Sequence, residues 1–166
     1  FTAVFFVVAF FTYPTTSFSA PENLIIPLWE NGAPGFENRK HEPEVVNKGS
    51  ITNVHNPSLT VFAPSKETSN GIGIIIAPGG GLRKLGMRGG GEEPAQFLAD
   101  NGFTAFVLKY RLSRQPGQPY KFEEHVLQDG QRAVRLVRHR AQEFHINPDK
   151  IGMLGFSAGG EVVSIT

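Results

Sequence analysis

Three continuous apolar runs, rich in β-branched residues, dominate the hydrophobic pattern of the chain. They cover 71–77, 104–108 and 151–155, and turn residues lie beside each of them. A strand that is buried on both faces of a parallel sheet has this kind of uninterrupted apolar sequence. We therefore predict three core strands at these positions.

Helical patterns separate these runs. The stretch 92–101 opens with acidic residues, and Gly102 follows it at the position of a C-terminal cap, which predicts a short helix. Over 122–144, small and apolar residues recur every three or four positions and most arginines fall on the other side, which predicts a long amphipathic helix. Another helix is predicted to begin at Ala158.

Two shorter β-like stretches, near 51–55 and 59–63, precede the core strands. Their alternation and the Asn56-Pro57 break between them predict an antiparallel hairpin, whereas 21–48 is predicted to be irregular. The order is a hairpin followed by alternating strands and helices. This order predicts a mostly parallel α/β sheet with helices on both faces and an antiparallel N-terminal hairpin.

The first nineteen residues follow a different pattern. Residues 1–13 are almost wholly apolar and uncharged, Pro14 interrupts them, and small polar residues lead to position 19. This pattern is typical of a secretory signal peptide, and the apolar run is short for a membrane span. We predict a signal peptide over 1–19 and a secreted or periplasmic protein that begins at Ala20. Because the chain starts with Phe and lacks a basic segment there, we expect the leader to be clipped.

Composition narrows the class of protein further. The chain has 166 residues, of which 40% are hydrophobic, so we expect 20–166 to belong to a single domain. Sixteen basic residues against fifteen acidic ones, without runs of like charge, argue against a nucleic-acid partner. The absence of cysteine excludes disulfides, thiolate metal sites and a cysteine nucleophile. After leader cleavage we expect no membrane partner.

A Gly-x-Ser-x-Gly pattern lies between the last predicted strand and the last predicted helix. It consists of Gly155, Phe156, Ser157, Ala158 and Gly159. In a sharp strand-to-helix turn, the two glycines remove side chains that would collide, and the turn presents the serine hydroxyl above the sheet. We predict that Ser157 is a catalytic nucleophile. The alternative is a glycine-rich structural turn in which the serine has no chemical role.

A second glycine-rich segment, Pro78-Gly79-Gly80-Gly81, follows the first core strand. In acyl transfer the carbonyl oxygen becomes an oxyanion, and bare backbone N–H groups must surround it. Three glycines allow that approach, and the residue after the serine would supply another N–H. A phosphate-binding loop fits less well, because Met87 stands where a Walker lysine is needed.

Four blocks of sequence, in this order, resemble the bacterial acetylxylan-esterase-like (acetyl esterase/lipase) branch of the α/β-hydrolases. They are 77–81, 106–112, 128–133 and 155–160, and the resemblance covers about residues 50–166. It implies an α/β-hydrolase fold and hydrolysis of short acyl esters, often acetyl groups on plant polysaccharides, without a metal or other cofactor. It also implies an acyl-enzyme on Ser157, with three oxyanion donors: Gly80, Gly81 and Ala158.

Two positions depart from the pattern of this family. Pro78 replaces the histidine that opens the loop in related lipases and esterases, and Glu161 stands where many relatives have a histidine. This branch of the family tolerates the proline, whereas Glu161 leads us to expect different contacts behind the serine turn.

The chain contains no residue that we expect to act as the base for Ser157. In α/β-hydrolases the acid and the histidine follow the nucleophile, whereas all five histidines here precede it. We expect His125, His139 and His145 on the surface, and we expect Asp129 to anchor its helix by hydrogen bonding. Truncation of the chain explains the missing acid and base, so we expect this fragment to be inactive alone and to expose an unpaired sheet edge.

Two other functions remain open at this point. A serine peptidase of the prolyl-oligopeptidase kind would have the same serine turn. A non-catalytic secreted binding protein on a hydrolase scaffold would have the fold without the chemistry. Neither alternative predicts a different arrangement of strands and helices.

Overall fold

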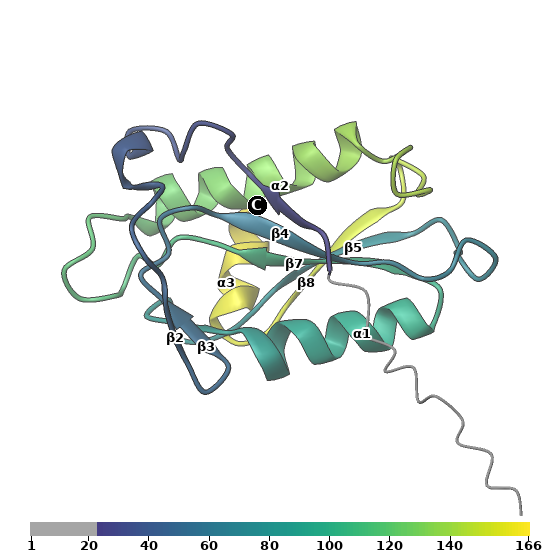
Figure 1. Cartoon of the computed structure of the whole chain (residues 1–166), viewed down its shortest axis with the longest axis horizontal. Coiled ribbons are helices and arrows are strands. Elements are labelled where there is room, and N and C mark those ends of the chain that lie inside the picture. Colours follow the sequence, from purple (N-terminus) through teal and green to yellow (C-terminus); the bar gives the residue numbers. More distant parts are fainter. Residues whose placement is uncertain (1–22) are drawn as a thin grey trace, which may run out of the picture.

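The computed structural model describes residues 23–166, so the predicted leader and its cleavage site lie outside the described residues (Figure 1). A five-stranded sheet with the order β1-β4-β7-β5-β8 forms the centre of the protein. β5 is parallel to both of its neighbours, whereas β4 is antiparallel to β1 and β7. The strands are Ile25–Pro27 (β1), Ser58–Phe62 (β4), Gly73–Ala77 (β5), Thr104–Lys109 (β7) and Ile151–Gly155 (β8). The three predicted core strands are thereby confirmed.

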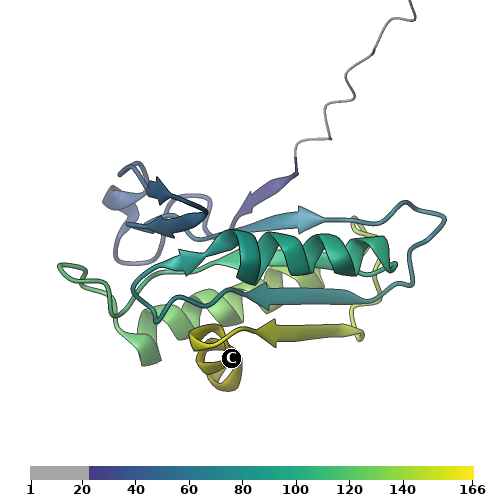
Figure 2. The ribbon, with the colours of Figure 1, turned by 90° about the horizontal axis from the view of Figure 1, so that it is seen from below.

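Helices cover both faces of this sheet, as predicted (Figures 1 and 2). α1 (Glu93–Asp100) packs on β7 from one side, whereas α2 (Leu127–His139) and α3 (Ala158–Ile165) pack together on the other. Gly102, at φ +87°, ends α1 in the left-handed conformation expected of a glycine cap. None of the helices in 23–166 combines the length and apolar character needed to cross a membrane.

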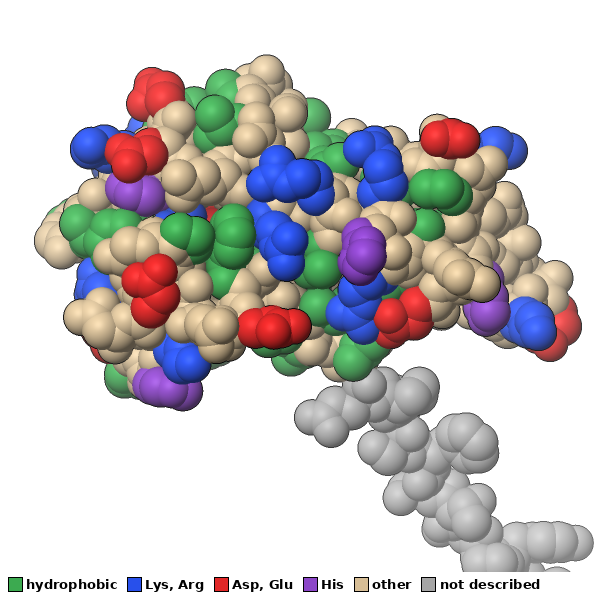
Figure 3. All heavy atoms as spheres, turned by 90° about the horizontal axis from the view of Figure 1, so that it is seen from above, with side chains coloured by type: hydrophobic (Ala, Val, Ile, Leu, Met, Phe, Trp, Pro, Cys, Tyr) green, Lys and Arg blue, Asp and Glu red, His purple; other side chains and the backbone are tan. Residues whose placement is uncertain are grey.

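The helix predicted over 122–144 is shorter than the apolar pattern from which it was predicted. One π-helical turn, Phe122–Val126, precedes α2, and α2 ends at His139 rather than continuing to position 144. The pattern continues because Ala141 and Phe144 still pack on the core from the turns that follow, with the Phe144 ring 5.1 Å from that of Phe106. Figure 3 shows basic side chains gathered over the outer side of α2, in agreement with the predicted arginine face.

The predicted hairpin between 51–55 and 59–63 is wrong. β3 (Ser50–Thr52) belongs to a second sheet, where it pairs antiparallel with β2 (Val45–Asn47) and β6 (Leu85–Gly86), whereas β4 pairs in the main sheet. The segment 53–57 therefore carries the chain from one sheet to the other instead of folding it back. The prediction of irregular structure over 21–48 likewise missed β1 and β2.

A buried ion pair joins the end of β7 to α2. The Arg111 guanidinium donates through Nη2 to Asp129 Oδ1 (2.8 Å) and through Nε to Oδ2 (2.9 Å), and the Arg111 backbone N–H also donates to Oδ2 (3.0 Å). Trp29 Nε1 adds a bond to Oδ1 (3.3 Å), and neither charged side chain is accessible to solvent. The predicted anchoring role of Asp129 is confirmed, and its carboxylate also holds the N-terminal segment.

The expectation that His125 lies on the surface is wrong, whereas His139 and His145 are exposed as expected. The His125 ring accepts a bond from the Lys121 N–H (2.9 Å) and packs edge-on against Phe36 and Tyr120. This position at the start of the helical segment lets one imidazole both bond a free backbone amide and fill an aromatic cluster. His55 is buried beside the same cluster, with Nδ1 2.6 Å from the Tyr120 hydroxyl.

We predict that the protein loses stability as the pH falls below about 6.5, the ordinary pKa of histidine. Burial lowers the pKa of both His55 and His125, and the Arg39 and Arg111 guanidinium groups add to the respective shifts. Between the lowered pKa and 6.5 the unfolded chain binds protons that the native protein does not, so the free energy of unfolding decreases with falling pH. Urea unfolding at pH 7.5 and pH 5.5 measures this decrease.

In the double variant His55→Gln/His125→Gln the decrease should be smaller than in the wild type. His139→Gln, which removes an exposed imidazole, is the matched control and should leave it unchanged. If the free energy of unfolding depended equally on pH in all three proteins, the assignment of this dependence to His55 and His125 would be contradicted.

Candidate active site

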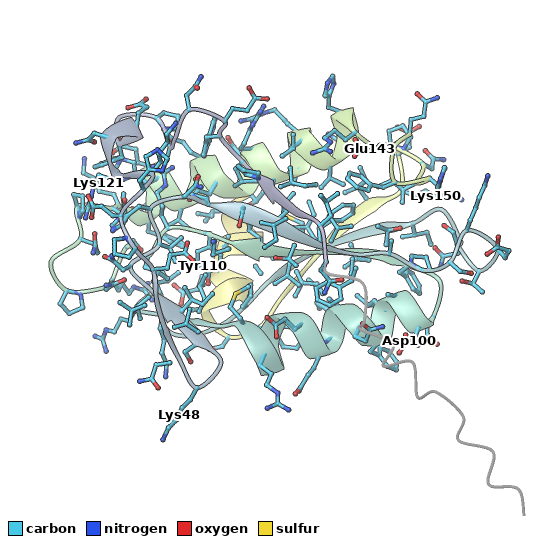
Figure 4. All side chains as sticks on the ribbon, viewed as in Figure 1. Lys48, Asp100, Tyr110, Lys121, Glu143 and Lys150 are labelled. Carbon is cyan, nitrogen blue, oxygen red and sulfur yellow. The ribbon has the colours of Figure 1, made fainter. Side chains whose placement is uncertain are left out.

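The carboxyl ends of β5, β7 and β8 meet at one edge of the main sheet and carry the predicted site residues. The 78–81 loop follows β5 and Ser157 follows β8, and Tyr110, which is labelled in Figure 4, follows β7. Parallel strands place the residues after their carboxyl ends at a common edge, where ligands of open α/β sheets bind. The loop after β5 and the turn after β8, which are far apart in the sequence, thus come into contact here.

Ser157 lies on a sharp turn between β8 and α3. Its backbone has φ 51° and ψ −120°, a conformation that residues with a side chain rarely adopt, and its side chain is exposed. A Cβ on Gly159 would overlap the Ala77 carbonyl oxygen, and one on Gly155 would stand 2.6 Å from the Gly160 nitrogen. The two glycines are therefore required by direct backbone contact, in the strand–turn–helix setting that the sequence predicted.

The glycine loop rests directly against this turn. A Cβ on Gly79 would stand 2.7 Å from the Phe156 carbonyl oxygen and 3.1 Å from Ser157 Cβ. The Phe156 N–H donates to the Ala77 carbonyl (3.1 Å), which ties the two segments together. Gly80 (φ +139°) and Gly81 (φ +66°) have positive φ, so the chain can turn sharply beside the serine.

The backbone amides of Gly80, Gly81 and Ala158 have no acceptor within the described part of the chain, and the same holds for those of Gly79, Leu82 and Ser157 beside them. The next amides of α3 are bonded: the Gly159 N–H donates to the Phe156 carbonyl (2.8 Å), and the Gly160 N–H donates to the Ser157 carbonyl (2.8 Å). Free N–H groups need a partner from solvent or a ligand, and such groups beside a nucleophile can stabilise an oxygen that gains negative charge. The structure thus brings together all the residues that the sequence predicted for the site.

Tyr110 holds the glycine loop from below, although it was not among the predicted site residues. Its hydroxyl donates to the Pro78 carbonyl oxygen (2.6 Å), and the side chain is wholly buried. Burial strongly raises the pKa of the Tyr110 hydroxyl, so it remains a protonated donor at physiological pH. The sequence did contain a signal for this role: a tyrosine, with its hydroxyl group, directly follows a core strand, and the site lies at the carboxyl ends of these strands.

Glu161, in the first turn of α3, forms an ion pair with Arg114. Its carboxylate accepts two bonds from the Arg114 guanidinium, at 2.7 and 3.2 Å, and this arginine lowers the pKa of the Glu161 carboxyl. The Arg114 backbone N–H donates to the Leu82 carbonyl (2.9 Å) just past the glycine loop. Glu161, which stands where many relatives have a histidine, is therefore paired with an arginine.

Within residues 23–166 no histidine forms a hydrogen bond with Ser157. His55 bonds Tyr120 and Asn53, and His125 bonds Lys121. No group of three or more His, Cys, Asp or Glu side chains in the same residues is arranged to hold a metal ion. The arrangement contains a candidate nucleophile and amide donors without a base.

Comparison with known proteins identifies relatives for most of the chain. Residues 59–166 match the protein family described as BD-FAE. The acetylxylan esterase of Xylanibacter ruminicola is 33% identical over 107 residues, which are 64% of this chain and 21% of that protein. The segment that matches the BD-FAE family includes the glycine loop, Tyr110 and the serine turn.

Solved structures share the arrangement of strands and helices. The acetyl ester-xyloside bifunctional hydrolase of Caldicellulosiruptor lactoaceticus is 35% identical, with a TM-score of 0.65, over 87% of this chain and 46% of that one. The propionate-bound esterase Est2 of Thermogutta terrifontis has a TM-score of 0.61 at 23% identity, over 88% and 45% of the two chains. This chain therefore spans less than half of either solved chain, and the α/β-hydrolase fold expected from sequence is confirmed.

We predict opposite effects of alanine at two adjacent glycines of α3. Gly159→Ala should lower the free energy of unfolding by about 1–3 kcal/mol, because its methyl group would overlap the Ala77 carbonyl. Gly160→Ala should raise it by roughly 0.5–1 kcal/mol, because its methyl group would make only an ordinary contact, 3.9 Å from the Gly155 carbonyl oxygen, and alanine favours helix. Urea unfolding followed by circular dichroism measures both, and equal effects would contradict the close contact.

Proposed function

Because the chain belongs to the BD-FAE family of α/β-hydrolase esterases, we propose that it supplies the nucleophile and oxyanion hole of a serine esterase. The observation that carries the proposal is the exposed Ser157 on its strained turn, beside amides such as those of Gly80, Gly81 and Ala158 that have no protein acceptor in the described residues. The proposed substrates are short acyl esters, with acetyl groups on carbohydrates as the main class. The names of the acetylxylan esterase and the acetyl ester-xyloside hydrolase support this class.

The proposed reaction proceeds through an acyl-enzyme. Ser157 Oγ attacks the ester carbonyl while its proton passes to a base. The resulting oxyanion accepts bonds from the amides of Gly80, Gly81 and Ala158. Collapse of this intermediate expels the alcohol, which takes a proton from the protonated base. Water, deprotonated by the same base, then attacks the acyl-serine, and the acid product leaves with Ser157 restored.

We propose that the base is a histidine, held by a carboxylate, from a segment outside residues 1–166. The order of the triad in α/β-hydrolases supports this, because the acid and histidine follow the nucleophile. The chain by itself is then inactive as an esterase. A leader over 1–19, which would export the enzyme, is consistent with a polysaccharide substrate outside the cell.

Replacement of Ser157 tests the nucleophile. In the enzyme extended to include the acid and histidine, Ser157→Ala should lower kcat/KM for p-nitrophenyl acetate by several orders of magnitude. Ser164→Ala, which removes an exposed hydroxyl on the same helix, is the control and should retain full activity. Retained activity in Ser157→Ala would exclude the proposed role, and faster cleavage of a peptide p-nitroanilide than of the ester would favour the peptidase alternative.

Replacement of Tyr110 tests how the glycine loop is held. Tyr110→Phe leaves the Pro78 carbonyl without its donor, so the amides of the loop should lose alignment and kcat should fall about tenfold at similar KM. Tyr120→Phe makes the same chemical change at the His55 contact, away from the loop, and should leave kcat unchanged. If both variants behave alike, the Tyr110 hydroxyl has no specific role in positioning the loop.

A further inference from the structure

A groove lies on the outer face of the small β2-β3-β6 sheet. Its volume is about 370 Å³, and it is lined by Val45, Asn47, Lys48, Ser50, Thr52 and Lys84. The strand register places Val45 opposite Thr52 and Asn47 opposite Ser50, so these four share one face. The other face packs on the core through Ile51 and Leu85. Most of this lining precedes residue 59 and so lies outside the segment that matches the BD-FAE family.

Backbone hydrogen bonds connect one wall of the groove to the glycine loop of the proposed active site. The Lys84 N–H donates to the Gly80 carbonyl (3.3 Å), and a Cβ on Gly80 would stand 3.2 Å from Lys84 Cγ. Gly86, opposite Ser50 in the small sheet, donates its N–H to the Gly79 carbonyl (2.8 Å). One stretch of backbone therefore joins a wall of the groove to the loop beside Ser157.

The charge in this groove is entirely positive. Lys48 and Lys84 both line it, and no carboxylate does. Neither lysine forms an ion pair within residues 23–166; Lys40, Lys66 and Lys150 form none either, so the feature particular to this pair is that both line one groove. Two ammonium groups without a protein counter-charge favour an anionic ligand. Asn47, Ser50 and Thr52 add amide and hydroxyl groups that can bond sugar hydroxyls.

The position of Lys48 is a second, independent observation. Lys48 and Gly49 form the two-residue turn between β2 and β3, with φ 46° and 77° (Figure 4). Turns of this kind favour Asn, Asp or Gly at the first position, because a side chain is strained there. The chain keeps a lysine at the tip of the turn despite this strain, and strained residues concentrate where a side chain has a function.

We propose that this lysine groove binds a uronate, a sugar that bears a carboxylate, in the polysaccharide whose acyl ester reaches Ser157. The two ammonium groups bind the carboxylate, the polar side chains bind the hydroxyls, and Val45 contacts the apolar face of the ring. The proposal rests on the proposed esterase function for the link between groove and ester. Binding itself requires no catalysis, so it can be measured separately.

The experiment compares two xylo-oligosaccharides of equal length, one bearing a glucuronate branch and one unbranched, by isothermal titration of the purified chain. We expect the acidic oligosaccharide to bind more tightly, with an affinity that falls as salt is added. In Lys48→Gln/Lys84→Gln its affinity should fall about tenfold, because bonds to a charged group are lost. The neutral oligosaccharide should bind the variant and the wild type equally.

Lys66→Gln/Lys150→Gln is the matched control, since it removes the same net charge from exposed positions outside the groove. It should leave both affinities unchanged. Equal binding of the two oligosaccharides, an equal effect of the two double variants, or complete competition by inorganic phosphate at the same concentration would overturn the proposal. In the extended enzyme, p-nitrophenyl acetate hydrolysis reports on the esterase function alone: uronate binding without hydrolysis would refute only that function, and hydrolysis without uronate binding only the groove.

Discussion

Direct backbone contact between the ends of β5 and β8 is the constraint on which the site depends. Gly159 lies against the Ala77 carbonyl, and Gly79 lies against the Phe156 carbonyl, with no room for a side chain at either contact. This contact fixes the loop and the serine turn relative to one another, so the free amides and the hydroxyl of Ser157 cannot move apart independently. The unusual backbone conformation of Ser157 is stable because both sides of the turn are held in this way.

The segment that follows β7 connects this contact to the rest of the fold. Within five residues, Tyr110 bonds the loop, Arg111 bonds Asp129 of α2, and Arg114 bonds both Leu82 and Glu161. One short segment therefore ties the loop, α2 and α3 together. The interactions of Tyr110 and Arg111 are buried, whereas the ion pair of Arg114 is exposed. Because exposed ion pairs contribute little to stability, we expect the buried interactions to hold the loop more strongly than the ion pair does.

Local patterns in the sequence predicted much of this arrangement, but they did not predict contacts between residues that are far apart in the chain. The core strands and the serine turn follow from runs of neighbouring residues, and both are present. The partner of a strand depends on residues far away: β4 pairs with β7 instead of β3, and no local signal distinguishes these. The burial of His125 depends on an aromatic cluster with Phe36, and the role of Tyr110 depends on a carbonyl 32 residues earlier in the chain.

The most direct test of the account is a crystal structure of the extended enzyme after reaction with paraoxon. The account predicts a diethyl phosphate bonded to Ser157 Oγ, with its phosphoryl oxygen about 2.7–3.1 Å from the amide nitrogens of Gly80, Gly81 and Ala158. A phosphate on another residue, or a phosphoryl oxygen directed away from these amides, would contradict it.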